Sequence, residues 1–315
     1  MIRRLSIAAL VGGSLLAAAP SFAAQLVLVN TDVANIGFND PTPAAPVGGN
    51  AGTTLGEQRL IAYRRALDLW GSVLRSNVPV RVRGSFARLN CTAGGGVLAS
   101  AGALAVFADF PSAPVPGVWY GAALANSIAG VDLDPTGDDI QANFNGAVGQ
   151  PDCIAGPGFY YGLDNNPPAG AIDFLNTFMH EVAHGLGFQN FVNEATGLRL
   201  AGRDDIYMVN TRDLTLDQQW TALTAAQIVQ SSIRNGQVVW TGTEVNANQS
   251  LVLGAFEGVR VTGNVSAELN FGTASFGALL TAATLDGDIV AAVDADGTLD
   301  PSDACGPLVN PASYV

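Results

Sequence analysis

Hydrophobic residues recur at helical spacing in two segments of this chain. The first segment begins near Thr53 and Thr54, either of which can cap a helix, and Glu57 completes the pattern of a capping box with Thr54. Its apolar positions are Leu60, Tyr63, Leu67, Trp70 and Leu74. The second segment carries one apolar stripe at Ile172, Leu175, Met179, Val182 and Leu186, and Gly185 and Gly187 are expected to end it. A third helix is predicted over 223–235, with Thr224 as its cap.

Strands are predicted where apolar residues alternate with polar ones or form short runs. These segments are 25–30, 78–86 and 138–145. Residues 97–110 and 117–130 have no regular pattern and predict no defined element. From about Ala247 onward, short β-rich runs alternate with glycine turns and acidic loops. The pattern therefore predicts an α+β fold with a β-rich C-terminal segment.

Composition narrows the class of protein. The 315 residues are 48% hydrophobic and 13% charged, which is enough apolar material for a sizeable core. The formal net charge is −13, and all of the basic residues are arginine. An acidic chain of this kind is not expected to bind nucleic acid or an anionic membrane surface.

The N-terminus has the pattern of a secretory signal peptide. Arg3 and Arg4 precede an apolar run over 7–19, and small residues follow up to Ala23. We therefore expect residues 1–23 to be removed and the protein to be secreted or periplasmic. No later segment reaches 18 consecutive apolar residues, so no transmembrane anchor is expected.

The stretch FMHEVAHGLGFQN contains both histidines of the chain, His180 and His184, with Glu181 between them. Residues four apart lie on one face of a helix, so both imidazoles can reach one metal ion. A glutamate beside them can act as general base and then general acid in hydrolysis. The motif therefore predicts a Zn²⁺ site with His180 and His184 as ligands and Glu181 as the catalytic residue.

The sequence from His180 to Phe188 resembles the zincin metalloproteases, and within them the leishmanolysin-like branch of the metzincins. Residues 64–82 are similar to the first helix and strand of metzincin domains. Residues 138–145 resemble the edge strand that binds an extended substrate in this family. The resemblance covers roughly residues 25–245 and implies a zincin-like domain, with a mixed twisted sheet and an active-site helix.

A catalytic zinc usually has three protein ligands, and the third is not evident here. Where most metzincins place a His or Asp, this chain has Asn190, and an amide is a poor zinc ligand. Glu194, Asp204 and Asp205 are alternatives, with Met208 expected beneath the site. In leishmanolysin-like enzymes the third His lies far downstream, which here implies a ligand beyond residue 315.

The C-terminal segment resembles the start of a protease-associated domain. We expect a signal peptide over 1–23, a zincin-like domain over 24–245, and an incomplete protease-associated-like segment over 246–315. Cys91 and Cys153 are expected to form a disulfide because both lie in glycine-rich loops of the N-terminal half. Cys305 is then left unpaired.

These observations predict a secreted zinc endopeptidase that hydrolyses protein or peptide substrates through a zinc-bound water activated by Glu181. The alternative is a non-catalytic pseudo-protease that serves as an extracellular binding or surface module. A monomer is expected in either case. Calcium is a second possible ion, at two acidic loops. The first loop contains Asp132, Asp134, Asp138 and Asp139, and the second contains Asp294, Asp296 and Asp300.

Overall fold

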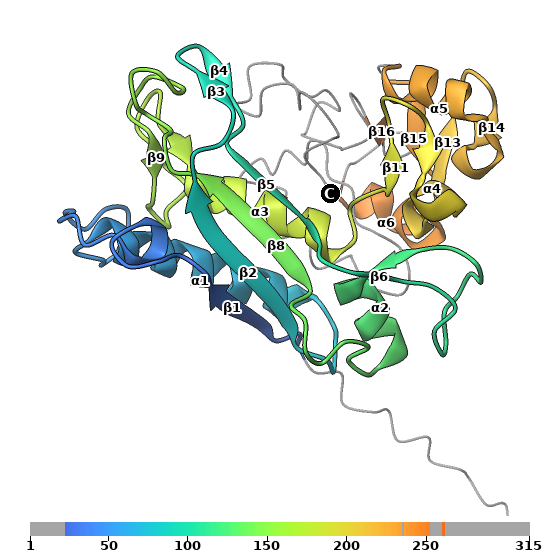
Figure 1. Ribbon diagram of the computed structural model, residues 1–315, viewed down its shortest axis with the longest axis horizontal. Coiled ribbons are helices and arrows are strands. Elements are labelled where there is room, and N and C mark those ends of the chain that lie inside the picture. The colour runs from blue at the N-terminus through green and yellow to red at the C-terminus, as the bar shows by residue number, and fades with distance from the viewer. Residues whose placement is uncertain (1–22, 235, 253–259, 262–315) are drawn as a thin grey trace, which may run out of the picture.

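The computed structural model describes residues 23–234, 236–252 and 260–261 as a mixed α+β fold (Figure 1). The predicted signal peptide up to residue 22 lies outside the described residues. So do Cys305, the second acidic loop and most of the predicted protease-associated-like segment. The α+β class expected from the sequence is confirmed for the described part of the chain.

A four-stranded sheet forms the centre of the fold, in the order β1-β2-β8-β5. These strands are Leu26–Asn30, Val80–Ala87, Ile140–Asn145 and Ala99–Ala103. The first three are parallel to one another, and β5 runs antiparallel to β8. Along β2, residues alternate between buried and more exposed positions, as expected for a strand packed on one face.

The expectation that residues 138–145 form the edge strand is wrong. β8 lies inside the sheet, between β2 and β5, and hydrogen-bonds to both. β5 is the edge strand, although its sequence ASAGA has low β propensity and predicts no strand. Small side chains suit this position because β5 lies against a helix.

Helices α1 (Leu55–Val73) and α3 (Phe174–Leu186) cover the same face of the sheet (Figure 1). α1 packs against β1, α3 packs against β5 and β8, and the two helices contact each other. The predicted capping box of α1 is present at Thr54. The Trp70 indole N–H donates to the carbonyl oxygen of Met179 at 3.1 Å, which ties α1 to the middle of α3.

Aromatic residues fill the space between the sheet and these two helices. The Tyr63 ring lies 4.1 Å from the Phe178 ring between centroids, and Phe144 of β8 contacts both α1 and α3 residues. Buried aromatic pairs of this kind fix the position of α3 on the sheet. The set comprises Phe38, Tyr63, Phe86, Phe144, Phe174 and Phe178.

Short elements complete the part of the fold before α3. The helices are η1 (Gly37–Asn39) and α2 (Ala122–Ala129). The strands are β3 (Cys91–Thr92), β4 (Gly95–Gly96), β6 (Val106–Phe107), β7 (Tyr120–Gly121), β9 (Phe159–Tyr160) and β10 (Ile172–Asp173).

The chain after α3 forms a smaller mixed region, coloured yellow to orange in Figure 1. Its strands are β11 (Val192–Asn193), β12 (Leu198–Arg199), β13 (Thr211–Asp213), β14 (Gln218–Gln219), β15 (Val238–Trp240) and β16 (Arg260–Val261). Its helices are η2 (Leu200–Gly202), α4 (Ile206–Val209), η3 (Trp220–Ala222), α5 (Ala225–Ser232) and α6 (Thr243–Val252). The third predicted helix is α5, with its predicted cap at Thr224. α6 runs across the domain boundary expected after residue 245.

The predicted disulfide between Cys91 and Cys153 is confirmed, and it joins β3 to the loop between β8 and β9, 62 positions along the sequence. A disulfide is typical of proteins that fold in an oxidising compartment. Within the described ranges, no helix has both the length and the apolar character needed to cross a membrane.

Candidate metal centre

Helix α3 carries the HEVAH motif. It can pack close to the sheet because Gly185 has no side chain. A β-carbon at this position would lie 2.3 Å from Cγ2 of Ile140 in β8, which is closer than packing permits. Asp173 caps the start of the helix by accepting a hydrogen bond from the Asn176 N–H at 2.9 Å. Gly187, with a φ of 133°, then ends it in a conformation that favours glycine.

The two histidines lie side by side on α3 and are buried, with exposed fractions of 6% for His180 and 3% for His184. Their Nε2 atoms are 3.1 Å apart, and their rings are nearly perpendicular, at 79°. Two nitrogens bound to one tetrahedral zinc at 2.0–2.1 Å would lie about 3.3 Å apart. The imidazole pair is therefore spaced as two ligands of one zinc ion require.

The backbone after α3 fixes the tautomer of His184. Its Nδ1 lies 2.8 Å from the carbonyl oxygen of Phe188, and a carbonyl can only accept, so Nδ1–H donates. The lone pair is then on Nε2, which faces His180. Burial, together with the neighbouring His180, lowers the pKa of His184 to about 3, so the ring is neutral at pH 7. A neutral imidazole with an oriented Nε2 lone pair is the form that binds zinc.

Glu181 lies between α3 and the edge strand β5, one residue after the first histidine. Its carboxyl accepts a hydrogen bond from the backbone N–H of Ala101. The other oxygen, Oε2, is buried and has no hydrogen-bond partner among the described residues. Burial raises the pKa of Glu181 to about 8, and the Ala101 hydrogen bond opposes this rise. A buried carboxyl with an unpartnered oxygen is unfavourable for folding, and ionisable groups perturbed in this way cluster at functional sites.

Asn190 and the acidic candidates for a third ligand are engaged elsewhere in the structure. Asn190 donates to Glu194 Oε1 at 2.9 Å and accepts from the Val192 N–H at 3.0 Å. Asp204 forms an ion pair with Arg199. Across the described residues, no three His, Cys, Asp or Glu side chains come together as a metal site.

Asp205 has a structural role in this arrangement. It caps α4 by accepting from the Met208 N–H at 2.9 Å, and its second oxygen accepts from the Phe191 N–H at 2.7 Å. Burial raises the pKa of Asp205 to about 7. Both oxygens are thus used to hold the segment after α3 against α4.

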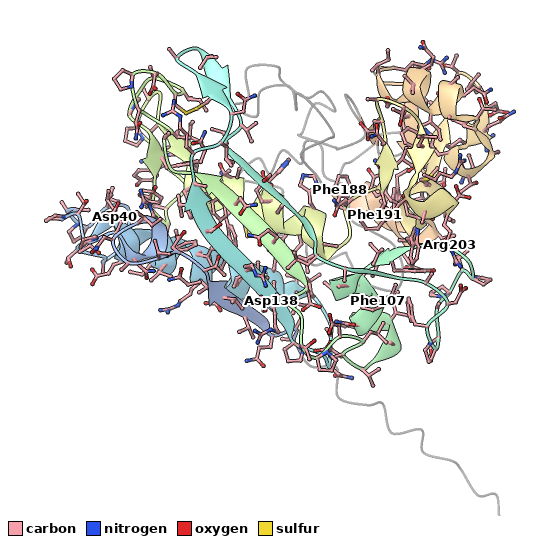
Figure 2. All side chains as sticks on the ribbon, in the orientation of Figure 1. Asp40, Phe107, Asp138, Phe188, Phe191 and Arg203 are labelled. Atoms are coloured by element: carbon pink, nitrogen blue, oxygen red, sulfur yellow. A yellow bond between two sulfur atoms is a disulfide. The ribbon has the colours of Figure 1, made fainter. Side chains whose placement is uncertain are left out.

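Aromatic packing links this segment to the histidines. The Phe188 ring lies 6.3 Å from the His184 ring and 5.3 Å from the Tyr207 ring, between centroids. Met208, the next residue, is completely buried in the same core. Figure 2 shows Phe188 and Phe191 where the chain passes from the end of α3 into the smaller region.

Residues that sequence reasoning missed lie around Glu181 and His184. The backbone N–H of Ala101 bonds to Glu181, and the carbonyl of Phe188 orients His184. The third such residue is Gln189, whose side chain contacts β5. Ala101 and Phe188 act through backbone groups, which leave no signal in residue type. Only the position of Phe188, four residues after His184, could have suggested its contact.

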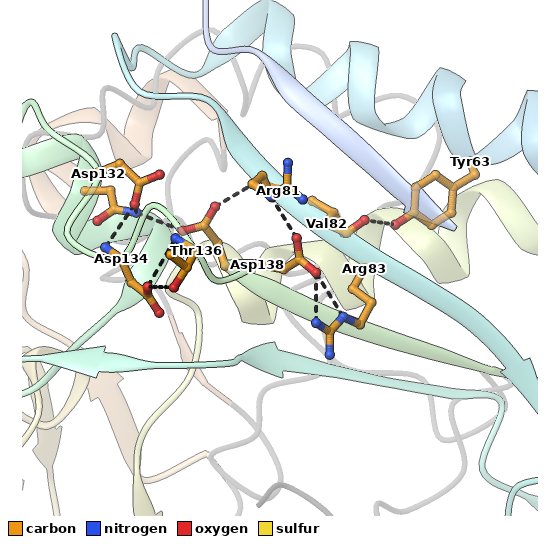
Figure 3. Close-up of polar contacts among 10 residues, drawn as sticks. Tyr63, Arg81, Val82, Arg83, Asp132, Asp134, Thr136 and Asp138 are labelled. Carbon is orange, nitrogen blue, oxygen red and sulfur yellow. Dashed lines mark hydrogen bonds and ion pairs between the residues drawn. The ribbon is translucent and has the colours of Figure 1, made fainter. Parts of the chain in front are cut away.

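In the first acidic loop, expected as a possible calcium site, the carboxylates bind neighbouring side chains and backbone groups of the protein (Figure 3). Asp138 forms ion pairs with Arg81 and Arg83, at 2.8 and 2.9 Å. Asp134 accepts from the Thr136 hydroxyl at 2.8 Å. Asp139 is buried and accepts from the Arg81 and Asn126 N–H groups, and burial raises its pKa. These contacts hold the turn that leads into β8.

Comparison with known proteins found no matching family model, no matching curated protein and no matching solved structure.

Proposed function

We propose that this protein is a secreted zinc endopeptidase with a zincin-like fold. The observation that carries the proposal is the pair of Nε2 atoms, 3.1 Å apart, on a helix that also carries the buried carboxyl of Glu181. The zincin-like assignment is supported by three parallel strands, an antiparallel edge strand and two helices on one face of the sheet. The Cys91–Cys153 disulfide supports an extracellular or periplasmic location.

His180 and His184 would hold the zinc ion. When bound, zinc would supply a Lewis acid for the scissile carbonyl and for a water molecule. The Phe188 carbonyl keeps His184 in the tautomer with its lone pair on Nε2. Glu181 takes a proton from the attacking water as the water oxygen adds to the carbonyl carbon. Glu181 then passes this proton to the leaving amine as the C–N bond breaks.

The outer edge of β5 is proposed to bind the peptide substrate as an additional strand. Among the described residues no strand pairs with this edge. Glu181 contacts Ala101 in the middle of β5, so a peptide along this edge would pass directly over the catalytic residue. We propose protein or peptide substrates as the ligands of this edge, and a monomer as the form that binds them.

A non-catalytic pseudo-protease is the second candidate, and one observation favours it. Within the part of the chain that the structure describes, only two residues of a three-ligand zinc site are brought together. Glu181 argues for catalysis, because a binding module gains nothing from a buried carboxyl with an unpartnered oxygen.

Casein hydrolysis tests the proposal. Activity of the purified protein should disappear in EDTA and return with zinc. Glu181→Gln should retain zinc and hydrolyse casein at least about 100-fold more slowly, because it cannot accept a proton. Asp68→Asn, an exposed change on α1, is the matched control and should match the wild type. A wild-type protein that binds zinc and hydrolyses nothing would favour the pseudo-protease.

A further inference from the structure

The backbone groups of β5 alternate between the sheet and its outer edge. The Asn145 N–H donates to the Leu98 carbonyl, and the Leu104 N–H donates to the Asp139 carbonyl, each at 2.8 Å. In an antiparallel pair, every second residue bonds to the neighbouring strand. Even-numbered residues of β5 therefore face β8, and the N–H groups of Ala101 and Ala103 point outward.

One side chain from α3 and one from the segment after it occupy both of these outward N–H groups. Ala101 donates to Glu181, and Ala103 donates to Oε1 of Gln189 at 3.1 Å. The Gln189 amide also lies against Gly102, where a β-carbon would come within 2.8 Å of Nε2. Glycine at position 102 thus leaves the space that the Gln189 amide fills.

The group that covers this edge has the chemistry of a peptide bond. A glutamine side chain presents a carbonyl oxygen and an N–H donor, as a main-chain amide does. Gln189 is half-buried and belongs to the segment immediately after α3. Its Oε1 makes the hydrogen bond to Ala103 that a peptide carbonyl would make if an additional strand paired with β5.

We infer that Gln189 gates the outer edge of β5 by occupying the Ala103 N–H in the free protein. In the free protein its side-chain carbonyl accepts the Ala103 N–H, as the carbonyl of a paired strand would. An extended peptide displaces this side chain in order to bind. This inference rests on the proposed function, because it takes a polypeptide as the ligand. Displacement costs the peptide one hydrogen bond, which corresponds to about fivefold in affinity.

Peptide binding without catalysis tests the gate. Fluorescence anisotropy of a fluorescein-labelled casein peptide, in EDTA, gives the affinity of each variant while cleavage is prevented. Gln189→Ala should bind about fivefold more tightly than the wild type, because Ala103 is then free to pair. Gln189→Glu should bind more weakly, since a carboxylate accepts from Ala103 more strongly than an amide does. Gln230→Ala, an exposed change on α5 that lies outside this edge, is the control and should match the wild type.

Amide hydrogen exchange gives a second readout that does not need a ligand. The Ala103 N–H should exchange faster in Gln189→Ala, while the N–H of Leu104, bonded to Asp139, should be unchanged.

Equal or weaker peptide binding by Gln189→Ala would overturn the gate. Absence of peptide binding in every variant would also overturn it, because the edge would then not be a peptide site. Zinc-dependent casein hydrolysis, measured on the same samples, reports separately on the proposed function and separates the two failures.

Discussion

Burial of Glu181 should make the metal-free protein less stable as the pH rises. The pKa of this carboxyl is about 8 in the folded protein, against 4.5 for an ordinary glutamate. Between these values the folded state keeps a proton that the unfolded state has lost. The free energy of unfolding therefore falls as the pH rises from about 4.5 to about 8, and the loss is complete above the folded pKa.

The variant Glu181→Gln removes this ionisation and should be more stable than the wild type at neutral pH. Each pH unit in this window costs the wild type about 1.36 kcal/mol, so the difference at pH 7 is roughly 3 kcal/mol. At this size of domain, that corresponds to a rise in Tm of roughly 10 °C. Near pH 4.5 Glu181 is neutral in the folded protein and only half ionised in the unfolded protein, so the two proteins should unfold almost alike.

Urea unfolding of both proteins in EDTA, from pH 4.5 to pH 9, measures the effect. Asp205, whose pKa is also raised by burial, is present in both proteins and cancels in the difference. Asp68→Asn serves as the control for a change of net charge by one. Parallel stability profiles for the wild type and Glu181→Gln at every pH would refute the account of a buried, destabilised carboxyl.

Three further changes test the architecture around the site. Gly185→Ala should lower the free energy of unfolding by about 2 kcal/mol in thermal unfolding, because the added β-carbon clashes with β8. Gly94→Ala is the control and should leave the free energy of unfolding unchanged, because a β-carbon there meets open space. Asp205→Asn should leave zinc affinity unchanged in calorimetric titration; a marked loss would make Asp205 a ligand and not only a cap. Replacing both Cys91 and Cys153 by alanine should cost about 4 kcal/mol in urea unfolding, given the 62-residue separation; an unchanged midpoint would contradict this.

Sequence patterns predicted the elements that are defined by the type and spacing of their own side chains. The stripe from Leu175 to Leu186 on α3 and the capping box of α1 follow from residue type and spacing, and both are present. Ile172, expected to begin the stripe, lies in β10, and Gly185, expected to help end the helix, lies inside it. The HEVAH spacing placed the two imidazoles together for the same reason.

The edge strand could not be predicted, because ASAGA holds its place through contacts made by other elements. β5 is fixed by pairing with β8 and by packing on α3, and neither is visible in its own sequence. The contact between Gln189 and Ala103 joins residues 86 positions apart through a backbone donor, so no local pattern marks it. The destabilised state of Glu181 likewise follows from burial beneath β5.

The central claim is that His180 and His184 bind one zinc ion through Nε2. Zinc K-edge X-ray absorption of the zinc-loaded protein tests it most directly, because it identifies the atoms around the metal and their distances. We expect two imidazole nitrogens at about 2.0–2.1 Å, with one imidazole lost in each of the variants His180→Ala and His184→Ala. A zinc ion surrounded by oxygen atoms alone, or an unchanged spectrum in both variants, would contradict it.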